Sequence, residues 1–340
     1  MLQSIRRLAR AEALAVLAML ALTTVSTCRA LADDPLPSWS DGAAKARIVA
    51  FVQGVTQPGG KDFVPPSERV AVFDNDGTLW SEQPMYFQLA FAIYRAKAMA
   101  AQAPELMAKP AFAAAVNGDM KALAATGEHG LLELVALTHA GTTSDEFAQI
   151  VRQWAETAQH PRFARPYTEL TFLPMRELLE YLRANDFRTW IVSGGGIEFL
   201  RVVSEELYGV PPEQVVGSSI RTRYEIRDGI PVIVRLPEID FIDDKGGKPV
   251  GIHRFIGRRP IAAFGNSDGD FEMLEWTTSA PGPRLGVLVH HDDAVREYAY
   301  DRKSPFGKLD RGLDEAGKRG WVVIDMKADW NTVYQAPVTH

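Results

Sequence analysis

The sequence predicts an α/β protein with a Rossmann-like, three-layer core built on a parallel sheet, together with an inserted α-helical cap. Short apolar runs alternate with helix-like stretches along most of the chain. Continuous apolar strands of this length are typical of a parallel sheet that is buried on both faces. Residues 81–170 lack strand-like alternation and are rich in residues that favour helices. We therefore expect this stretch to form a separate helical cap, inserted after the first strand.

The expected elements follow one another in an order that supports this division. Asp228-Gly229 lies between two strand-like runs and strongly favours a hairpin turn. The core is expected over residues 33–80 and 171–340. In chain order we expect a strand at 70–73, cap helices at 86–103, 112–125, 131–139 and 144–158, a helix at 173–184, a strand at 190–192, a hairpin of strands at 219–227 and 231–236, a strand at 261–264, a helix at 271–276 and a strand at 285–289.

The composition is that of an ordinary globular protein, with 46% hydrophobic and 24% charged residues among 340. These proportions exclude a largely disordered chain, a coiled coil and a collagen-like repeat. The net charge is -6, whereas a nucleic-acid-binding protein usually carries a basic excess. We therefore expect no nucleic-acid partner.

Residues 1–32 have the pattern of a bacterial signal peptide. Arginines precede the uncharged residues 13–28, and Ala30-Leu31-Ala32 fits a signal-peptidase site. A membrane-spanning helix needs roughly 20 apolar residues, so we expect no stable membrane span after cleavage and a periplasmic or secreted protein. The alternatives are an uncleaved anchor and a lipoprotein modified at Cys28. Cleavage would remove Cys28, the single cysteine, and a cysteine-free chain suits an oxidising compartment.

Two aspartates directly follow the first predicted strand. Asp74 and Asp76 lie two residues apart, so both can point into one cleft at the carboxyl end of that strand. A carboxylate such as Asp74 can act as a nucleophile toward a phosphoryl group, and Asp76 can serve as general acid and base. Gly77 permits the sharp turn that directs both side chains. The alternative is a surface turn or a fragment of a calcium loop.

A glycine-rich turn follows the second predicted core strand. Ser193 precedes Gly194, Gly195 and Gly196, and a helix-like segment comes next. Glycines allow backbone N–H groups to approach an anion closely, and a helix N-terminus favours negative charge. The Ser193 hydroxyl can hold a phosphate oxygen. We expect an anion-binding turn, with a helix cap and packing glycines as the alternative.

A lysine and several oxygen-bearing side chains lie near the third predicted core strand. Lys248, with Lys245 as a local rival, can neutralise charge on a nucleophile and on a transferring phosphoryl group. Asn266, Asp268 and Asp270 come directly after that strand, and such oxygen donors suit Mg²⁺. The alternatives are solvated loop charges and a turn that caps the next helix.

These motifs, in this order, resemble the haloacid dehalogenase superfamily of phosphohydrolases over residues 69–273. The resemblance implies a Rossmann-like core and a Mg²⁺-dependent mechanism with an aspartyl-phosphate intermediate. It identifies Asp74 as nucleophile and metal ligand, and Asp76 as acid and base and as a metal ligand through its backbone carbonyl. Ser193, with Gly194 beside it, and Lys248 match the residues that bind phosphate.

The metal motif departs from this family at one position. Asn266 stands where relatives have an aspartate, so it can ligate Mg²⁺ through its carbonyl oxygen but brings no charge. Asp270 matches the second aspartate of the motif. Asp268 is additional and could supply the missing charge. The sequence therefore leaves open which of these three residues contacts the metal.

The cap resembles the helical (C1-type) cap of the phosphoserine phosphatase-like branch. Phosphoserine phosphatases bind the substrate amine with a glutamate, and the same offset falls on Gln83 here, with Glu82 adjacent. Trp80, Tyr86 and Phe87 could form a cage for a quaternary ammonium such as choline, or they could pack the cap. Phosphoserine and phosphocholine are therefore the two candidate substrates.

The sequence as a whole predicts an exported, Mg²⁺-dependent phosphomonoesterase of small phosphorylated metabolites. The alternatives are a phosphotransferase with an alcohol acceptor and a non-catalytic protein that binds a phosphorylated ligand. His290 and His291 follow the last predicted strand, and one of them should face the cleft if that strand is parallel to the others. The alternative for these histidines is a structural role in a loop.

Overall fold

The computed structural model describes residues 34–337. Contacts divide the chain into a short unit that ends at Pro35 and a second unit that begins at Leu36 and contains all the elements described below. The predicted signal peptide, residues 1–32, lies outside the described residues. Within residues 34–337, no helix is both long and apolar enough to cross a membrane.

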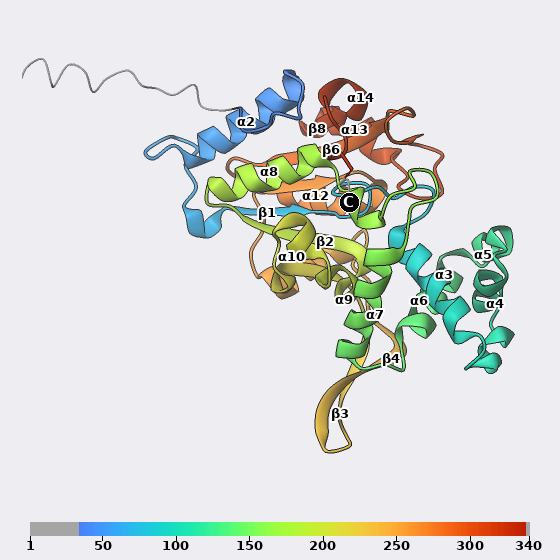
Figure 1. The fold of residues 1–340 in the computed structure, drawn as a ribbon. Coiled ribbons are helices and arrows are strands. Elements are labelled where there is room, and N and C mark those ends of the chain that lie inside the picture. Colours follow the sequence, from blue (N-terminus) through green and yellow to red (C-terminus); the bar gives the residue numbers. More distant parts are fainter. Residues whose placement is uncertain (1–33, 338–340) are drawn as a thin grey trace, which may run out of the picture. The chain divides into compact units, whose positions relative to one another are not determined.

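A mixed, mostly parallel sheet forms the centre of the second unit (Figure 1). Its strand order is β4-β3-β2-β1-β5-β6-β7, and β8 pairs with β6. Only β4 and β7 run antiparallel to their partners among the described strands. This arrangement confirms the predicted α/β class. The strands are β1 (Val70–Phe73), β2 (Arg188–Gly196), β3 (Val215–Arg227), β4 (Ile230–Phe241), β5 (Ala262–Gly265), β6 (Leu285–Asp292), β7 (Ala299–Tyr300) and β8 (Val322–Asp325).

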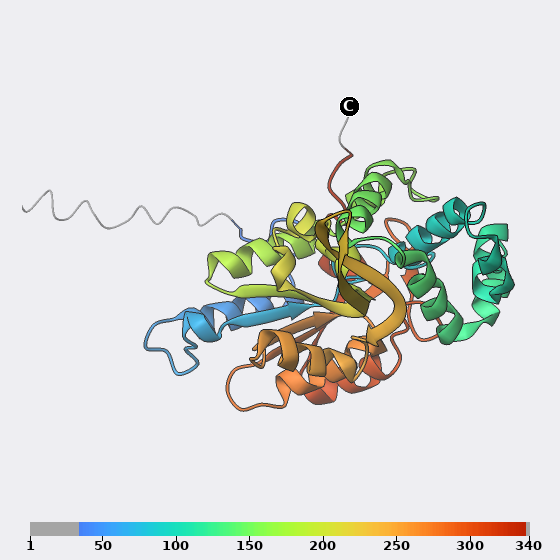
Figure 2. The ribbon, with the colours of Figure 1, turned by 90° about the horizontal axis from the view of Figure 1, so that it is seen from below.

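Strand β1 lies in a sheet that has helices on both of its faces (Figure 2). Ala71 and Phe73 belong to one apolar cluster, and Val70 and Val72 belong to another. Because successive strand residues face opposite sides of a sheet, the central strand is buried on both faces, which confirms the three-layer core. The first cluster includes residues of α2 (Ala43–Thr56) and α8 (Leu173–Ala184), and the second includes residues of α12 (Phe271–Thr278) and α13 (Arg311–Arg319).

The segment that follows β1 is helical, as predicted. The single helix expected over residues 112–125 is wrong, because Gly118 ends one helix at a φ of 71° and Asp119 caps the next by accepting a hydrogen bond from the Ala122 N–H. The first four helices share an apolar cluster and form one group in Figure 1. The boundaries of the cap at residues 81 and 170 stay a prediction. The helices are α3 (Phe87–Met99), α4 (Pro110–Asn117), α5 (Met120–Ala125), α6 (Gly127–His139) and α7 (Ser144–Thr157).

Strand β2 is longer than its apolar run suggests, because it continues through the glycines to Gly196. Its register against β3 shifts between Ser193 and Gly196, so the expected turn is an irregularity within the strand. Asp228 and Gly229 have φ values of 52° and 79° and close the predicted hairpin of β3 and β4. The remaining helices are α9 (Ile197–Arg201), α10 (Ser204–Tyr208), α11 (Gly247–Gly251) and α14 (Met326–Asp329).

Candidate active site

Lys248 joins the carboxyl ends of three neighbouring strands. Its Nζ donates hydrogen bonds to Asp74 Oδ1 at 2.5 Å, to Asp270 Oδ1 at 2.6 Å and to the backbone carbonyl of Val192 at 2.9 Å. Burial lowers the pKa of Lys248, but the carboxylates of Asp270 and Asp74 outweigh burial and raise the pKa above its ordinary value. The ammonium therefore stays charged. Lys245, the local rival, is exposed at the surface.

Asp74 and Asp76 follow β1 and differ in their surroundings. Burial raises the pKa of Asp74 well above its ordinary value, and the nearby Asp270 carboxylate raises it further, against the effect of Lys248. Asp76 Oδ1 accepts a hydrogen bond from Trp80 Nε1 at 2.8 Å. Burial raises the pKa of Asp76 to about 6, although this hydrogen bond opposes the change. A carboxyl with such a pKa can donate and accept a proton near neutral pH.

Asn266 and Asp270 lie in the loop after β5 and are both buried. Asp270 Oδ2 accepts hydrogen bonds at 3.0 Å from the backbone N–H groups of Asn266 and Ser267. Asn266 Oδ1 accepts a hydrogen bond from Thr78 Oγ1 at 3.2 Å. The loop after β5 thereby brings the asparagine against the turn that follows β1.

The oxygen donors in this region fit a magnesium ion. Asp74 and Asp270 share the single positive charge of Lys248, and Asp76 adds a third acidic group nearby. Two carboxylates, the Asn266 amide oxygen and a main-chain carbonyl are the hard ligands that Mg²⁺ prefers. A divalent cation would also balance the surplus negative charge. In the described part of the chain, no three histidine, cysteine, aspartate or glutamate side chains form a metal cluster.

Asp268, which the sequence left as one possible source of the charge that Asn266 lacks, is engaged elsewhere. Its carboxylate accepts hydrogen bonds from the backbone N–H groups of Asp310, Arg311 and Gly312. These groups belong to the first turn of α13, where a carboxylate is stabilised by the orphan amides and the helix dipole. Sequence spacing missed this cap because its partners lie more than 40 residues away along the chain.

Glu82 lies directly against Asn266. Asn266 Nδ2 donates to Glu82 Oε1 at 2.7 Å, and the Tyr300 hydroxyl donates to the same oxygen at 2.8 Å. Burial raises the pKa of Glu82 well above its ordinary value. The sequence pointed to Glu82 only as the neighbour of Gln83. Its true partners come from two distant segments, and no local pattern indicates them.

The residues of the predicted anion-binding turn lie beside Asp76. Ser193 Oγ accepts a hydrogen bond from the Gly195 N–H at 3.0 Å. A methyl group placed on Gly195 would lie 3.3 Å from Ser193 Oγ, 3.5 Å from Asp76 Oδ2 and 3.2 Å from Gln88 Oε1. Gly194 is exposed at this turn. The helix behind the turn, α9, has only five residues, so a helix dipole contributes little here.

Gln88 is a site residue that the sequence did not reveal. This side chain of α3 accepts a hydrogen bond from the Gly196 N–H at 2.6 Å through Oε1, and its Nε2 lies 3.0 Å from His139 Nε2. Burial lowers the pKa of His139 well below its ordinary value, so this ring is neutral and can accept the hydrogen bond. The cap helices α3 and α6 are thus bonded to the turn that follows Ser193.

His291 has a structural role behind the aspartates. Its Nε2 lies 2.7 Å from the Gly77 carbonyl oxygen, and its Nδ1 lies 3.1 Å from Glu297 Oε2. The ring also stacks on Tyr300, with 4.4 Å between the centroids. Because β6 runs parallel to β5, its end faces the same edge of the sheet, as expected. His290 instead points toward Asp325, with Nδ1 2.8 Å from Oδ1.

The aromatic cage suggested for a quaternary ammonium is not formed. Trp80 and Phe87 are fully buried and pack against each other, with 4.9 Å between their ring centroids. Tyr86 packs edge-on against Phe306. Gln83, at the position of the amine-binding glutamate, donates to the Phe306 carbonyl at 3.1 Å. Tyr86 and Gln83 thereby connect the segment before α3 to the loop after β7.

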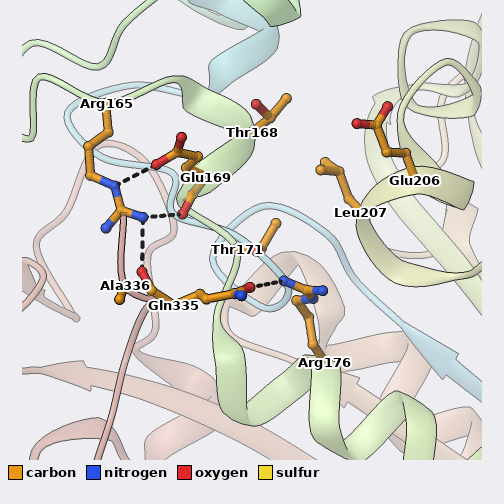
Figure 3. A pocket seen from close by; sticks show the side chains of 9 residues that line it. All are labelled: Arg165, Thr168, Glu169, Thr171, Arg176, Glu206, Leu207, Gln335 and Ala336. Carbon is orange, nitrogen blue, oxygen red and sulfur yellow. Dashed lines mark hydrogen bonds and ion pairs between the residues drawn. The ribbon is translucent and has the colours of Figure 1, made fainter. Parts of the chain in front are cut away.

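A separate surface pocket contains none of the predicted site residues (Figure 3). Its two arginines are already engaged, because Arg165 forms an ion pair with Glu169 at 3.0 Å and Arg176 donates to Gln335 Oε1 at 3.0 Å. It therefore does not compete with the Lys248 region as the reaction centre. The residues that line it are Arg165, Thr168, Glu169, Thr171, Arg176, Glu206, Leu207, Gln335 and Ala336.

A buried lysine between two aspartates at the ends of parallel strands is the arrangement that we compared with known protein families. The sequence profile of the haloacid dehalogenase-like hydrolases matches residues 71–275, which include the strand ends that meet at Lys248. The chain belongs to this family, which confirms the predicted superfamily and the prediction of a hydrolase. No curated protein matches the chain at a significant level.

Solved structures provide the corresponding comparison of folds. A Bordetella pertussis Tohama I protein of unknown function is 18% identical, with a TM-score of 0.50 over 76% of this chain and 99% of its own. A phosphoserine phosphohydrolase-like protein from Francisella tularensis is 16% identical, with a TM-score of 0.40 over 74% and 98% of the two chains. A probable phosphoserine phosphatase from Vibrio cholerae is 17% identical, with a TM-score of 0.37 over 73% and 64%. At these identities the first similarity establishes the fold and leaves the substrate open.

Proposed function

We propose that this chain is a Mg²⁺-dependent phosphomonoesterase that acts through an aspartyl-phosphate intermediate on Asp74. The observation that carries the proposal is the position of Lys248, whose Nζ lies within 2.6 Å of one carboxylate oxygen of Asp74 and one of Asp270. A phosphoryl group brought to Asp74 would meet this ammonium directly. Charge neutralisation and positioning carry most of the rate in phosphoryl transfer.

In this proposal Asp74 and Asp76 divide the chemistry between them. An Asp74 oxygen bonds to phosphorus while the bond from phosphorus to the leaving oxygen breaks, and protonated Asp76 gives its proton to that oxygen. Asp76 then takes a proton from water, the water oxygen bonds to phosphorus, and phosphate leaves with Asp74 restored. A pKa of about 6 suits Asp76 to both steps. The cation, when bound to Asp74, Asp270, Asn266 and the Asp76 carbonyl, would supply additional positive charge for the phosphoryl oxygens.

The polar groups at the carboxyl end of β2 would bind the phosphate. Ser193 and Gly194 belong to the glycine-rich segment that lies beside Asp76. Gln88 of the cap helix α3 contacts the same segment through the Gly196 N–H, so both the core and the cap shape this region. We therefore assign substrate phosphate to Ser193, Gly194 and Lys248 together. The cap would choose the rest of the substrate.

The proposal is tested with purified protein lacking residues 1–32, assayed with p-nitrophenyl phosphate in Mg²⁺ and in EDTA. We expect hydrolysis that requires Mg²⁺ and is lost in Asp74→Asn. Brief reaction with labelled substrate followed by acid quenching should trap label on the wild-type protein. Full activity of Asp74→Asn would overturn the assignment of the nucleophile.

A screen of phosphate release addresses the substrate. Phosphoserine and phosphocholine are included, together with nucleotides and sugar phosphates. Added acceptor alcohols distinguish a phosphotransferase, which would form a new phosphomonoester instead of free phosphate. Binding of a phosphorylated ligand without turnover would identify a non-catalytic binding protein.

We also infer that residues 1–32 direct export to the periplasm or the exterior. The support is the sequence pattern of a basic start, an uncharged run and an Ala-x-Ala site. Fusion of this segment to a reporter that is active only after export tests the inference. A reporter without activity outside the cytoplasm would contradict it.

A further inference from the structure

Asn266 presents a chemical problem that its neighbours address. An asparagine side chain has a donor end and an acceptor end, and only its oxygen can ligate a cation. Asn266 is 1% exposed, so water cannot adapt to either orientation. The protein must therefore fix which end of the amide points toward Glu82 and which toward Thr78, and so whether the oxygen is available as a ligand.

Glu82 fixes the orientation of the Asn266 amide through its hydrogen bond with Nδ2. Glu82 Oε1 accepts hydrogen bonds from Asn266 Nδ2 at 2.7 Å and from the Tyr300 hydroxyl at 2.8 Å. A carboxylate oxygen can accept two hydrogen bonds but cannot pair with the amide oxygen, which is also an acceptor, so Nδ2 is held on this side of the amide. The Asn266 oxygen is then left on the other side, where Thr78 Oγ1 donates to it at 3.2 Å.

Two glycines allow Glu82 to reach this position. Gly77 and Gly307 have φ values of 74° and 63°. A side chain at Gly77 would collide with both Asn266 and Glu82, and one at Gly307 would collide with Glu82. Glu82 itself is 1% exposed. The backbone on both sides is therefore shaped around this carboxyl group.

We propose that Glu82 is a positioning residue of the cation site, which holds the amide of Asn266 with its oxygen toward the cation and places an acidic group where Asn266 has none. This inference rests on the proposed function. It explains how a site can operate with asparagine at this position although Asp268 is turned away to cap α13.

An exchange of the two side-chain types tests the proposal. N266D places a second carboxylate against Glu82. Two carboxylates cannot form a hydrogen bond unless one of them is protonated, so the contact between the two side chains is lost or binds an additional proton. E82Q leaves two amides that can pair in either orientation. In E82Q/N266D the amide at position 82 can donate a hydrogen bond to the carboxylate at position 266. The hydrogen bond between the two side chains is thereby restored, with donor and acceptor exchanged. E238Q, at an exposed ion pair with Arg221, is the matched control.

Two measurements at pH 8 are made on all variants. Thermal unfolding in EDTA should show a lower Tm for N266D and recovery of most of the loss in E82Q/N266D. Calorimetric titration with Mg²⁺ should show at least tenfold weaker binding by E82Q, with binding by E82Q/N266D close to that of the wild type. Neither value should change in E238Q.

The outcomes separate this inference from the proposed function. Wild-type affinity for Mg²⁺ in E82Q, or a double variant no more stable than N266D, overturns the role of Glu82 and leaves the proposed function intact. Absence of Mg²⁺ binding by the wild-type protein overturns both. Recovery in the double variant in both measurements supports the pair as described.

Discussion

Gln88 Oε1 accepts a hydrogen bond from the backbone N–H of Gly196 at 2.6 Å. The two residues lie more than 100 positions apart, one on the first cap helix and the other at the end of β2. Because the same turn contains Ser193, this bond couples the position of the cap to the residues proposed to bind phosphate.

Replacement of Gln88 by leucine should impair the site more than the fold. The Gly196 N–H would lose its acceptor, which costs about 1–3 kcal/mol when the group is buried. We expect kcat/KM to fall about tenfold or more and the free energy of unfolding to fall by no more than that amount. Steady-state kinetics and urea denaturation provide the two values. Gln88→Glu keeps the acceptor and should retain more activity, and equal activity of both variants would contradict this role.

Replacement of Lys248 by methionine should reduce both activity and stability. Loss of a charge that stabilises the transition state typically costs 100-fold or more, on the order of 3 kcal/mol. Asp74 and Asp270 would remain buried without their common partner, which costs about 3–5 kcal/mol of unfolding free energy. Urea denaturation at pH 7 in EDTA measures the second effect.

The matched comparison for this variant removes one of the two carboxylates. Asp74→Asn in the Lys248→Met background should recover part of the lost stability without restoring activity. If Lys248→Met alone is as stable as the wild-type protein, the electrostatic role assigned to the lysine is wrong.

An alanine at position 195 should block the site without unfolding the protein. Its methyl group would occupy the space between Asp76, Ser193 and Gln88, at 3.2–3.5 Å from each. Contacts of this length can be relieved by small shifts, so we expect a loss of activity of tenfold or more and little change in Tm. Gly54→Ala, on α2 and with nothing within 4 Å of the added carbon, is the control. Unchanged kinetics in Gly195→Ala would place substrate elsewhere.

The stability of the metal-free protein should depend on pH through Asp76. Its folded-state pKa is raised to about 6 by burial, so between about pH 4 and 6 the folded chain binds more protons than the unfolded chain. The free energy of unfolding should therefore decrease as pH rises through this range, by up to about 3 kcal/mol from this group. Asp76→Asn removes that contribution. The free energy of unfolding of the variant should therefore rise relative to that of the wild-type protein as the pH approaches 6. Urea denaturation at several pH values measures it, and a constant difference would contradict the raised pKa.

Local sequence patterns sufficed wherever the determining interactions were local. The apolar run of β1 and the Asp228-Gly229 turn each predicted their elements, because burial and backbone conformation act within a few residues. The prediction of a single helix over residues 112–125 was wrong although the signals that contradict it are also local. Gly118 and Asp119 carry the signals of a helix end and a new cap, and the helix-favouring residues on either side concealed them.

The sequence by itself determined the order of strand, cap and core, the family, and the identity of the acidic residues and the lysine that follow the strands. Each of these depends on residue type and spacing along the chain. Only the tertiary structure decided that Asp268 caps α13 and that Glu82 and Gln88 lie in the site. These contacts join segments that are 42, 184 and 108 residues apart. Such pairings arise when parallel strands bring their carboxyl ends to one edge of a sheet, and the spacing of residues along the chain does not encode them.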